Sequence, residues 1–349
     1  MKNTSSFARL WSYLKVYKFA VAFAIFLKIL SVVMSVVEPF VLGLAITELT
    51  NNLLDMAKGV AGAQINMSYV GWVMVLYFVR AIFYEIGSYY SNYFMTNAVQ
   101  ATIRDLRDGL SHKINRIPVS YFDRHQFGDL LGRFTSDVEA VSNALQQSFL
   151  QVINAVFTLI LVIVMVLVLN LQLGIIVVIS IPITYLSARF IVKKSQPYFK
   201  QQADALGAMN GFVQENLTGF NILKLYVREE SSQEDFRQIT QDLQKVGFKA
   251  SFISGLMMPV LNVISDLTYL LLALLGGLQV IAGRLTVGNM QAFVQYVWQI
   301  NQPIQNLTQL AGQLQSAKSS LDRIFQVLDE ADEVNDKTKK LEQDLTGQV

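Results

Sequence analysis

Four long apolar stretches constrain the fold of this chain more than any other feature of its sequence. They cover residues 19–37, 149–169, 173–192 and 256–281, with Lys28 inside the first and Asp266 inside the last. A helix of roughly 20 apolar residues crosses the hydrocarbon core of a bilayer. Soluble domains seldom contain several such segments, so the sequence predicts a membrane protein.

The composition supports this class and excludes others. Hydrophobic residues make up 52% of the chain and charged residues 15%, against roughly 25% charged in an average soluble protein. The net charge of +2 argues against a nucleic-acid-binding protein, so we expect no nucleic-acid partner. The chain has no cysteine and only two histidines, which excludes disulfides and thiolate sites and leaves little material for a zinc site.

Two weaker stretches complete the predicted topology. Residues 69–84 contain Arg80, and residues 287–300 are short, although their helical pattern continues towards Leu310. For each, a buried or interfacial helix is the alternative to a span. We predict six transmembrane helices, an even number that places both termini on one side. The predicted spans cover about 19–48, 69–100, 138–169, 173–200, 252–282 and 288–315.

Basic residues predict the orientation of these spans. Lysines and arginines are concentrated before the first span and in two long connections, between the second and third spans and between the fourth and fifth. The opposite loops contain only Lys58 and Arg284. Because basic loops stay in the cytoplasm, we expect both termini and both long connections to be cytoplasmic.

The long connections carry helical periodicity. Apolar residues recur at steps of three and four in residues 98–117 and again in residues 233–248, with charged residues on the other face. An apolar stripe on a helix outside the membrane must be buried against another helix or a partner. The sequence therefore predicts a six-helix bundle that extends well into the cytoplasm.

The turn of the first cytoplasmic connection resembles a known family. The string IPVSYFDRHQFGDLLGRFTSDVEAV is similar to the first intracellular loop of ATP-binding cassette (ABC) exporters of the multidrug, lipid and peptide export branch. That family has a proline, an aromatic pair with aspartate, a glycine and then a helix with arginine and aspartate. The corresponding residues here are Pro118, Tyr121, Phe122, Asp123, Gly128, Arg133 and Asp137.

Other segments extend the resemblance over essentially the whole chain. FVQENLTGFNILKLYVREE is similar to the second coupling segment of the family, and SAKSSLDRIFQVLDE to the stretch that leads from the sixth span to the ATPase domain. Pro39, Gly43 and the segment GRLTVGNMQAF are weaker matches. The resemblance implies an all-α membrane protein with the ABC exporter transmembrane fold. Its six transmembrane helices would have long cytoplasmic extensions and two intracellular coupling loops.

The sequence contains no phosphate-binding loop, signature motif or acidic Walker B strand. We therefore expect no ATP hydrolysis and no cofactor in this chain. The resemblance implies that ATP and Mg²⁺ are held by a nucleotide-binding domain beginning near residue 340. Residues 326–349 would be the linker to it, after residues 1–325 of transmembrane domain. We favour a shortened chain over a natural half-transporter.

In this family, motor domains move the spans through the tips of the cytoplasmic helices, and the fourth and fifth spans are exchanged between subunits. The resemblance implies plugs at residues 119–124 and 218–226. The alternative is that the aromatic pair only packs a helical hairpin. The residues implied in coupling to the ATPase domains are Pro118, Tyr121, Phe122, Asp123, Arg124, Glu215, Gly219 and Lys224.

Charged residues in or beside the spans are the other candidate site, since each is unfavourable in lipid unless paired or hydrated. We expect Glu38, Glu85 and Asp266, with Trp72 and Trp298, to line a substrate pathway. The alternatives are pairing of Lys28 or Arg80 with one of the acids, or snorkelling towards an interface.

These observations predict the membrane-spanning half of an ATP-driven exporter for a hydrophobic or amphipathic compound, namely a drug, lipid or peptide. Its expected partners are a second transporter half, in a homodimer or heterodimer, two nucleotide-binding domains, membrane lipid and the substrate. The expected location is a plasma membrane, with a bacterial origin favoured. The alternatives are a six-span secondary transporter or channel that uses intramembrane carboxylates, and a structural scaffold.

Overall fold

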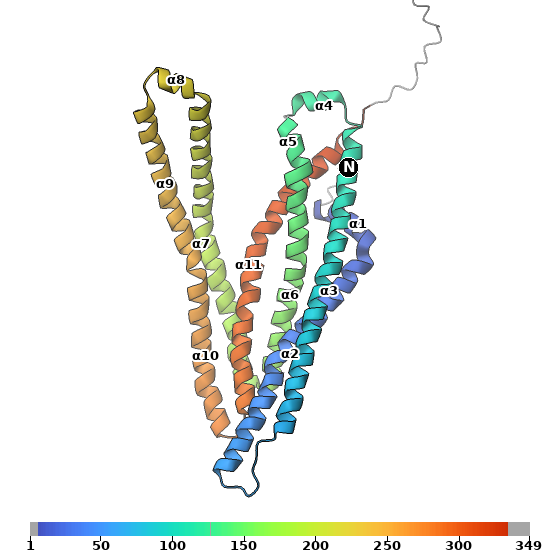
Figure 1. Cartoon of the computed structure of the whole chain (residues 1–349), viewed down its shortest axis with the longest axis vertical. Helices are drawn as coiled ribbons and strands as arrows, with labels where there is room; N and C mark the ends of the chain where they lie inside the picture. Colours follow the sequence, from blue (N-terminus) through green and yellow to red (C-terminus); the bar gives the residue numbers. More distant parts are fainter. Residues whose placement is uncertain (1–5, 126, 334–349) are drawn as a thin grey trace, which may run out of the picture. The chain divides into compact units, whose positions relative to one another are not determined.

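The computed structural model describes residues 6–125 and 127–333, and this part of the chain is helical throughout, with short connections (Figure 1). A 3₁₀ turn, Lys15–Tyr17, joins the first two helices, and a π turn, Arg133–Asp137, precedes α6. The α-helices are α1 (Ser6–Leu14), α2 (Lys18–Ala57), α3 (Met67–Ile114), α4 (Val119–Arg124), α5 (Phe127–Gly132), α6 (Val138–Leu169), α7 (Leu171–Thr218), α8 (Phe220–Leu225), α9 (Glu229–Gly255), α10 (Met257–Ile281) and α11 (Val287–Asp329).

The described chain forms two compact units. The first unit takes its residues from Met1–Lys28, Ile86–Ile153 and Leu310–Val349, and the second from Ile29–Glu85 and Asn154–Gln309. The long helices α2, α3, α6 and α11 each contribute residues to both units.

The core of the first unit confirms the apolar stripe predicted for residues 98–117. Val99, Ile103, Leu106 and Leu110 recur at three- and four-residue steps along α3, and all four are buried. They belong to one hydrophobic cluster with residues of α1, α6 and the end of α11. The first of the two predicted extensions therefore packs against its own chain.

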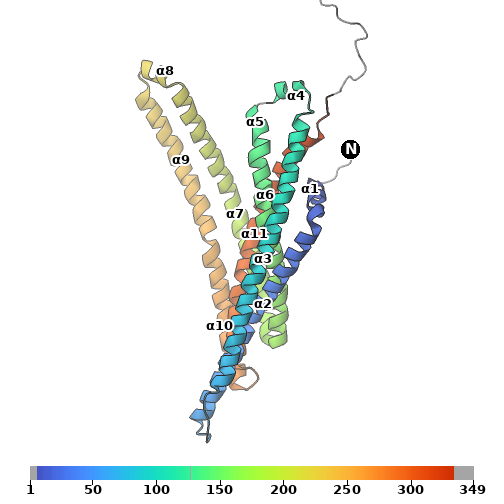
Figure 2. The same ribbon diagram turned by 45° about the vertical axis from the view of Figure 1, so that its right-hand side comes forward.

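The second unit contains the pair formed by α7 and the successive helices α9 and α10. Figures 1 and 2 both show α7 beside α9, with α8 joining them at one end. Its core is centred on aromatic and aliphatic side chains of α7, α10 and α11, including Tyr296, Phe293, Leu173 and Leu261. The stripe predicted for residues 233–248 is only half buried, and Phe236 remains exposed.

Five of the six predicted spans are long and apolar enough to cross a membrane. The helical segments that qualify are Ser6–Ala57, Met67–Ile114, Phe127–Leu169, Leu171–Thr218 and Glu229–Ile281. The sixth, α11, is a continuous helix but is not among them. It has no charged residue from Leu285 to Ala317, yet glutamine and asparagine recur throughout that stretch.

Helix α11 extends further than the predicted span. It runs as far as Asp329, and Leu321, Ile324 and Val327 are buried in the core of the first unit. The first residues of the predicted linker thus belong to a packed helix. The rest of that linker, from residue 334 on, lies outside the described residues.

Two glycines allow α2 and α11 to approach closely in the second unit. A Cβ atom added to Gly43 would lie 2.7 Å from the carbonyl oxygen of Gly288. One added to Gly288 would lie closer still to the carbonyl of Gly43. Small residues allow helix backbones to pack against each other in membranes. The contact joins Gly43 to the GRLTVGNMQAF segment, which contains Gly288.

Candidate functional site

The turn between α7 and α9 is a short helix, α8, at the end of this helix pair. Helix α7 ends at Thr218, and the N–H of Gly219 donates a hydrogen bond to the carbonyl of Glu215 at 2.8 Å. The carbonyl of Gly219 then accepts from the N–H of Leu223 at 2.9 Å. A Cβ atom at Gly219 would approach the Glu215 carbonyl to 3.2 Å. Glycine thus suits the sharp change of direction between α7 and α8.

The outer surface of α8 is unusually apolar. Leu225 is 78% exposed and Val227 is 81% exposed, at the end of the turn farthest from α7. We call this surface the α8 tip patch. Its exposed members are Phe220, Ile222, Leu225, Tyr226 and Val227. Exposed apolar side chains that are grouped at one turn are typical of an interaction surface.

Backbone strain occurs in the same patch. Val227 has φ of 52°, and it is the sole non-glycine residue with positive φ in the described chain. Its N–H donates to the carbonyl of Lys224, and the N–H of Arg228 donates to the carbonyl of Leu223. This is the Schellman ending of a helix, in which glycine normally takes the left-handed position. A β-branched residue there is strained by about 1–2 kcal/mol.

Two other helices end in the same way with glycine. Gly59 after α2 has φ of 73°, and Gly283 after α10 has φ of 70°. In both endings the following residue, Val60 or Arg284, donates its N–H back to the carbonyl of the third-last helical residue. Within residues 6–125 and 127–333, glycine thus takes the left-handed position at two Schellman endings, and valine takes it at the α8 tip patch.

An ion pair connects α8 to the helix that follows it. Lys224 Nζ lies 3.0 Å from the Glu229 carboxylate, and so joins α8 to the start of α9. Hydrogen bonds from the backbone N–H of Glu229 and from Lys224 hold the pKa of that carboxyl below its ordinary value. An open hollow of about 570 Å³ lies between α7, α8 and α9 and is lined by Glu215, Arg228 and Asp235 among others.

The first turn is built differently. Pro118 is extended, with φ of −58° and ψ of 145°, and precedes α4. Tyr121 is only 8% exposed; its ring stacks on His125 with centroids 4.1 Å apart, and its hydroxyl accepts from Arg133 at 3.0 Å. Phe122 is partly buried against the same core. The aromatic pair therefore packs the hairpin, and the coupling role implied by the resemblance stays a prediction.

The exposed surface of the first turn consists of other residues. On α4 these are Val119, Ser120, Asp123 and Arg124. Phe127, at the start of α5, is 78% exposed. Sequence reasoning missed Phe127. Its spacing from Leu130, Leu131 and Phe134 is that of one apolar helix face, so no local signal pointed to an exposed side chain.

Ion pairs tie the first turn to the end of α11. Arg323 Nε donates to the buried carboxylate of Asp137 at 2.8 Å. Lys113 contacts Asp332, and this hydrogen bond holds the pKa of the Asp332 carboxyl below its ordinary value. The Asp137 position of the resemblance thus anchors the returning helix on α11.

An ion pair lies within the predicted first and second spans. Arg80 of α3 places a guanidinium nitrogen 3.0 Å from the Glu38 carboxylate of α2, and only 7% of the Arg80 side chain is exposed. Tyr77 donates its hydroxyl to Glu38 at 2.7 Å, and the Arg80 guanidinium lies 4.9 Å from the centre of the Tyr77 ring. The pairing alternative therefore holds for Glu38.

Side chains from α3 and α11 satisfy carbonyl groups next to the proline in α2. Pro39 has no N–H, so the carbonyl of Ser35 loses its helical donor. Gln299 donates to that carbonyl at 3.4 Å, and Tyr296 donates to the neighbouring carbonyl of Val36 at 2.9 Å. Arg80 also donates to the carbonyl of Met34 at 2.9 Å. The proline segment of α2 is thereby held from two neighbouring helices.

The sequence matches the family of ABC transporter transmembrane regions over residues 21–304, which is most of the chain. This match covers the turns at α4 and α8, the ion pair of Arg80 with Glu38, and the segment of α2 around Pro39. The chain belongs to the ABC transporter transmembrane family. The resemblance drawn from the turns and the predicted exporter fold are thereby confirmed.

Similar ABC proteins come from several bacteria. A fatty acid ABC transporter ATP-binding/permease protein of Mycobacterium bovis is 34% identical over 72% of this chain and 40% of its own length. An uncharacterized ABC transporter ATP-binding protein of Bacillus subtilis is 28% identical over 98% of this chain and 55% of its own length. An ATP-dependent lipid A-core flippase of Photobacterium profundum is 23% identical over 96% of this chain and 56% of its own length. The chain thus spans about half the length of these relatives.

The other candidate pathway residues of this ABC membrane domain take no part in the ion pair. Glu85 and Asp266 are exposed on α3 and α10, and neither forms an ion pair with any described residue. Trp72 and Trp298 are also exposed. Across residues 6–125 and 127–333, no three histidine, cysteine or acidic side chains are grouped to hold a metal ion.

Proposed function

We propose that this ABC membrane domain forms, with a second half, a translocation path for a hydrophobic or amphipathic compound. We further propose that nucleotide-binding domains drive it through the turns at α4 and α8. Family membership supports an ATP-driven exporter over a secondary transporter or channel. The names of the relatives, a fatty acid transporter and a lipid A-core flippase, favour a lipid-like substrate over a peptide.

The α8 tip patch is the observation that carries this proposal. Its apolar side chains are exposed, and one of them, Val227, occupies a backbone conformation that glycine would adopt without strain. Strained positions persist where the residue serves a function. Docking in an apolar groove of a partner would bury these side chains and offset the strain.

The α4 turn supplies a second, more polar contact. Val119 and Phe127 offer apolar area, while Asp123 and Arg124 offer charges of both signs. Tyr121 and Pro118 position this surface from beneath and do not meet the partner directly. In this arrangement Glu215, Gly219 and Lys224 shape the second turn in the same way.

ATP and Mg²⁺ belong to the motor domains in this proposal. The Mycobacterium and Bacillus relatives carry ATP-binding in their names, and each is about twice the length that matches here. The chain itself supplies spans, turns and the path for the substrate.

Transport by the assembled exporter tests the proposal. Proteoliposomes that contain this membrane domain with its nucleotide-binding domains should move a fluorescent long-chain fatty acid only when ATP and Mg²⁺ are present. Asp266→Asn and Glu85→Gln should change the preference for a cationic dye, whereas Glu38→Gln should act mainly on stability because Glu38 is paired. Transport driven by an ion gradient without ATP would contradict the proposal.

A further inference from the structure

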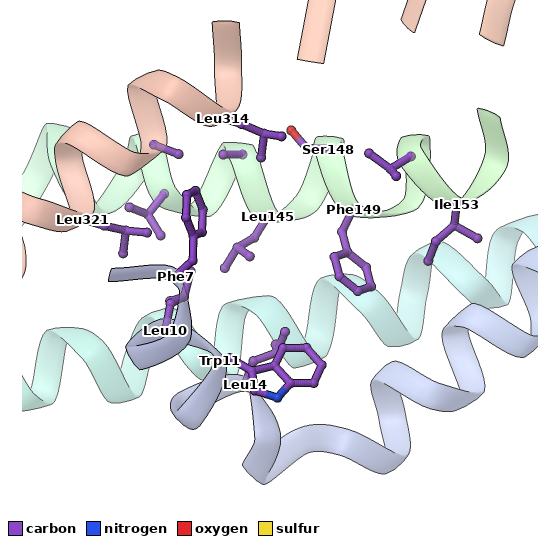
Figure 3. A pocket seen from close by; sticks show the side chains of 14 residues that line it. Phe7, Leu10, Trp11, Leu14, Leu145, Ser148, Phe149, Ile153, Leu314 and Leu321 are labelled. Carbon is purple, nitrogen blue, oxygen red and sulfur yellow. The ribbon is translucent and has the colours of Figure 1, made fainter. Parts of the chain in front are cut away.

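A cavity of about 350 Å³ lies beneath α1 in the first unit (Figure 3). Helix α1 contributes Phe7, Leu10, Trp11 and Leu14, which lie at i, i+3, i+4 and i+7 and so share one face of the helix. The opposite walls come from α6 and from the final third of α11. The whole apolar face of α1 is therefore turned towards this space.

The chemistry of the walls selects a hydrocarbon. Ser148 is the one polar side chain among the lining residues, and its hydroxyl already donates to Gln313 at 3.3 Å. The remaining lining side chains are aliphatic or aromatic. A polar ligand would lose its hydrogen bonds to water here without replacement. The volume is at the small end of ligand pockets, which run from roughly 300 to 1,000 Å³, and suits one chain better than two.

The entrance to the cavity resembles a membrane interface. Trp11 is 51% exposed, so its indole forms part of the rim as well as the wall. Tryptophan is enriched at the level of lipid headgroups. A short helix with one apolar face and basic neighbours lies in the interfacial plane of a bilayer.

Basic residues beside the rim favour an anionic headgroup. Lys15 and Lys18 follow the lining residue Leu14 and are exposed, and neither pairs with a carboxylate among the described residues. Arg9, by contrast, donates to Asp329 at 2.8 Å and is already neutralised. Unpaired lysines next to a membrane attract anionic lipids.

We propose that this cavity holds one acyl chain of an anionic phospholipid from the surrounding bilayer, with its headgroup at Lys15 and Lys18. The bound lipid would join α1 to α6 and α11. The lining residues all belong to the first unit, whereas the candidate pathway residues belong to the second, and the inference does not depend on the proposed transport activity.

Quenching of Trp11 fluorescence tests this proposal directly. The chain has three tryptophans, so Trp72→Phe with Trp298→Phe leaves Trp11 as the single reporter. The purified chain is placed in phosphatidylcholine nanodiscs that contain a small fraction of lipid brominated on its acyl chain. Brominated phosphatidylglycerol should quench Trp11 at least twofold more than the same fraction of brominated phosphatidylcholine.

Filling the cavity should remove this preference. Ala144→Phe places a ring in the lining, whereas Asn143→Phe adds the same ring at the neighbouring exposed position of α6, outside the lining. In Ala144→Phe, both brominated lipids should quench Trp11 equally. Asn143→Phe should keep the preference of the parent chain for phosphatidylglycerol. Ala144→Leu, a smaller change, should give an intermediate ratio if Ala144→Phe does not fold. Lys15→Gln with Lys18→Gln should reduce the preference without altering the fold.

Three results would overturn the inference. Equal quenching by both lipids in the parent chain would show that Trp11 senses only bulk lipid. A preference that survives in the folded cavity-filling variant would place the lipid elsewhere. Cavity-dependent quenching by a brominated free fatty acid, but not by brominated phosphatidylglycerol, would assign the site to a different ligand.

Discussion

The guanidinium of Arg80 lies 3.0 Å from the carboxylate of Glu38, and the two residues belong to different helices that are mostly apolar at this level. Tyr77 donates to the same carboxylate, so Glu38 has two partners. A charged residue in a membrane is unfavourable unless paired or hydrated. The pair therefore joins α2 to α3, and Glu38 is not a free anion awaiting a cationic substrate.

Breaking this pair from one side should destabilise the protein. Arg80→Gln leaves Glu38 without its cationic partner. Because the Glu38 side chain is 33% exposed, the loss should fall below the roughly 3–5 kcal/mol of a fully buried pair. The double variant Arg80→Gln, Glu38→Gln should recover a large part of that loss, because no lone charge remains. Thermal unfolding in detergent measures both. Tyr77→Phe is the matched control and should cost only about 1 kcal/mol. Equal melting temperatures for the single and double variants would contradict the assignment.

The contact between Gly43 and Gly288 should not tolerate a methyl group. A Cβ at either position meets a backbone carbonyl, which cannot move aside as a side chain can. Gly43→Ala or Gly288→Ala should therefore destabilise the protein by about 1–3 kcal/mol or more, as overpacking does. Gly277→Ala is the control, since nothing lies within 4 Å of its added Cβ. A neutral effect at Gly43 and Gly288 would show that α2 and α11 do not approach this closely.

Opposite substitutions at two Schellman endings should have opposite effects on stability. Val227→Gly removes the strain at φ of 52° and should raise stability by about 1 kcal/mol, whereas Gly283→Val at φ of 70° should lower it by a similar amount. Despite its greater stability, Val227→Gly should weaken docking of the motor domain because an exposed apolar contact is lost. If Val227→Gly bound the motor domain as the parent does, the strained conformation of Val227 would have no role in docking.

Tyr121 and Phe127 should separate folding from docking in the first turn. Tyr121→Ala removes a buried ring and its hydrogen bond from Arg133, so it should lower the melting temperature, with a loss of about 3 kcal/mol or more. Phe127→Ala changes an exposed residue, so the free energy of unfolding should stay within about 0.5 kcal/mol of the parent value. Binding of the motor domain should nevertheless weaken. The reverse pattern would restore Tyr121 as the docking residue.

Much of this fold was accessible from the sequence because its strongest signals are local. Runs of apolar residues and three- and four-residue periodicity predicted the long helices. Gly43 and Gly288 were also noticed, but only as separate weak matches. Their contact depends on residues far apart in the chain, and no local pattern reports such a distance.

Other features depend on tertiary packing that the sequence does not display. The resemblance implied a coupling role for Tyr121, which is buried on α4, and passed over Phe127, which is exposed. The left-handed conformation of Val227 contradicts the preference of its residue type, so local propensity could not predict it. The pairing of Arg80 with Glu38 was one of several open alternatives until both side chains were placed.

The most direct test of the account is binding of a purified ABC nucleotide-binding domain to this membrane domain in nanodiscs. The variant Phe220→Ser, Leu225→Ser removes two members of the α8 tip patch, and the control Val60→Ser, Ile281→Ser removes two equally apolar, exposed residues at other helix ends. Two apolar anchors lost at about 1 kcal/mol or more each should weaken binding at least tenfold in the first variant. The control should bind as the parent does. Equal affinity of the parent and the tip variant would contradict the proposal that α8 receives the motor.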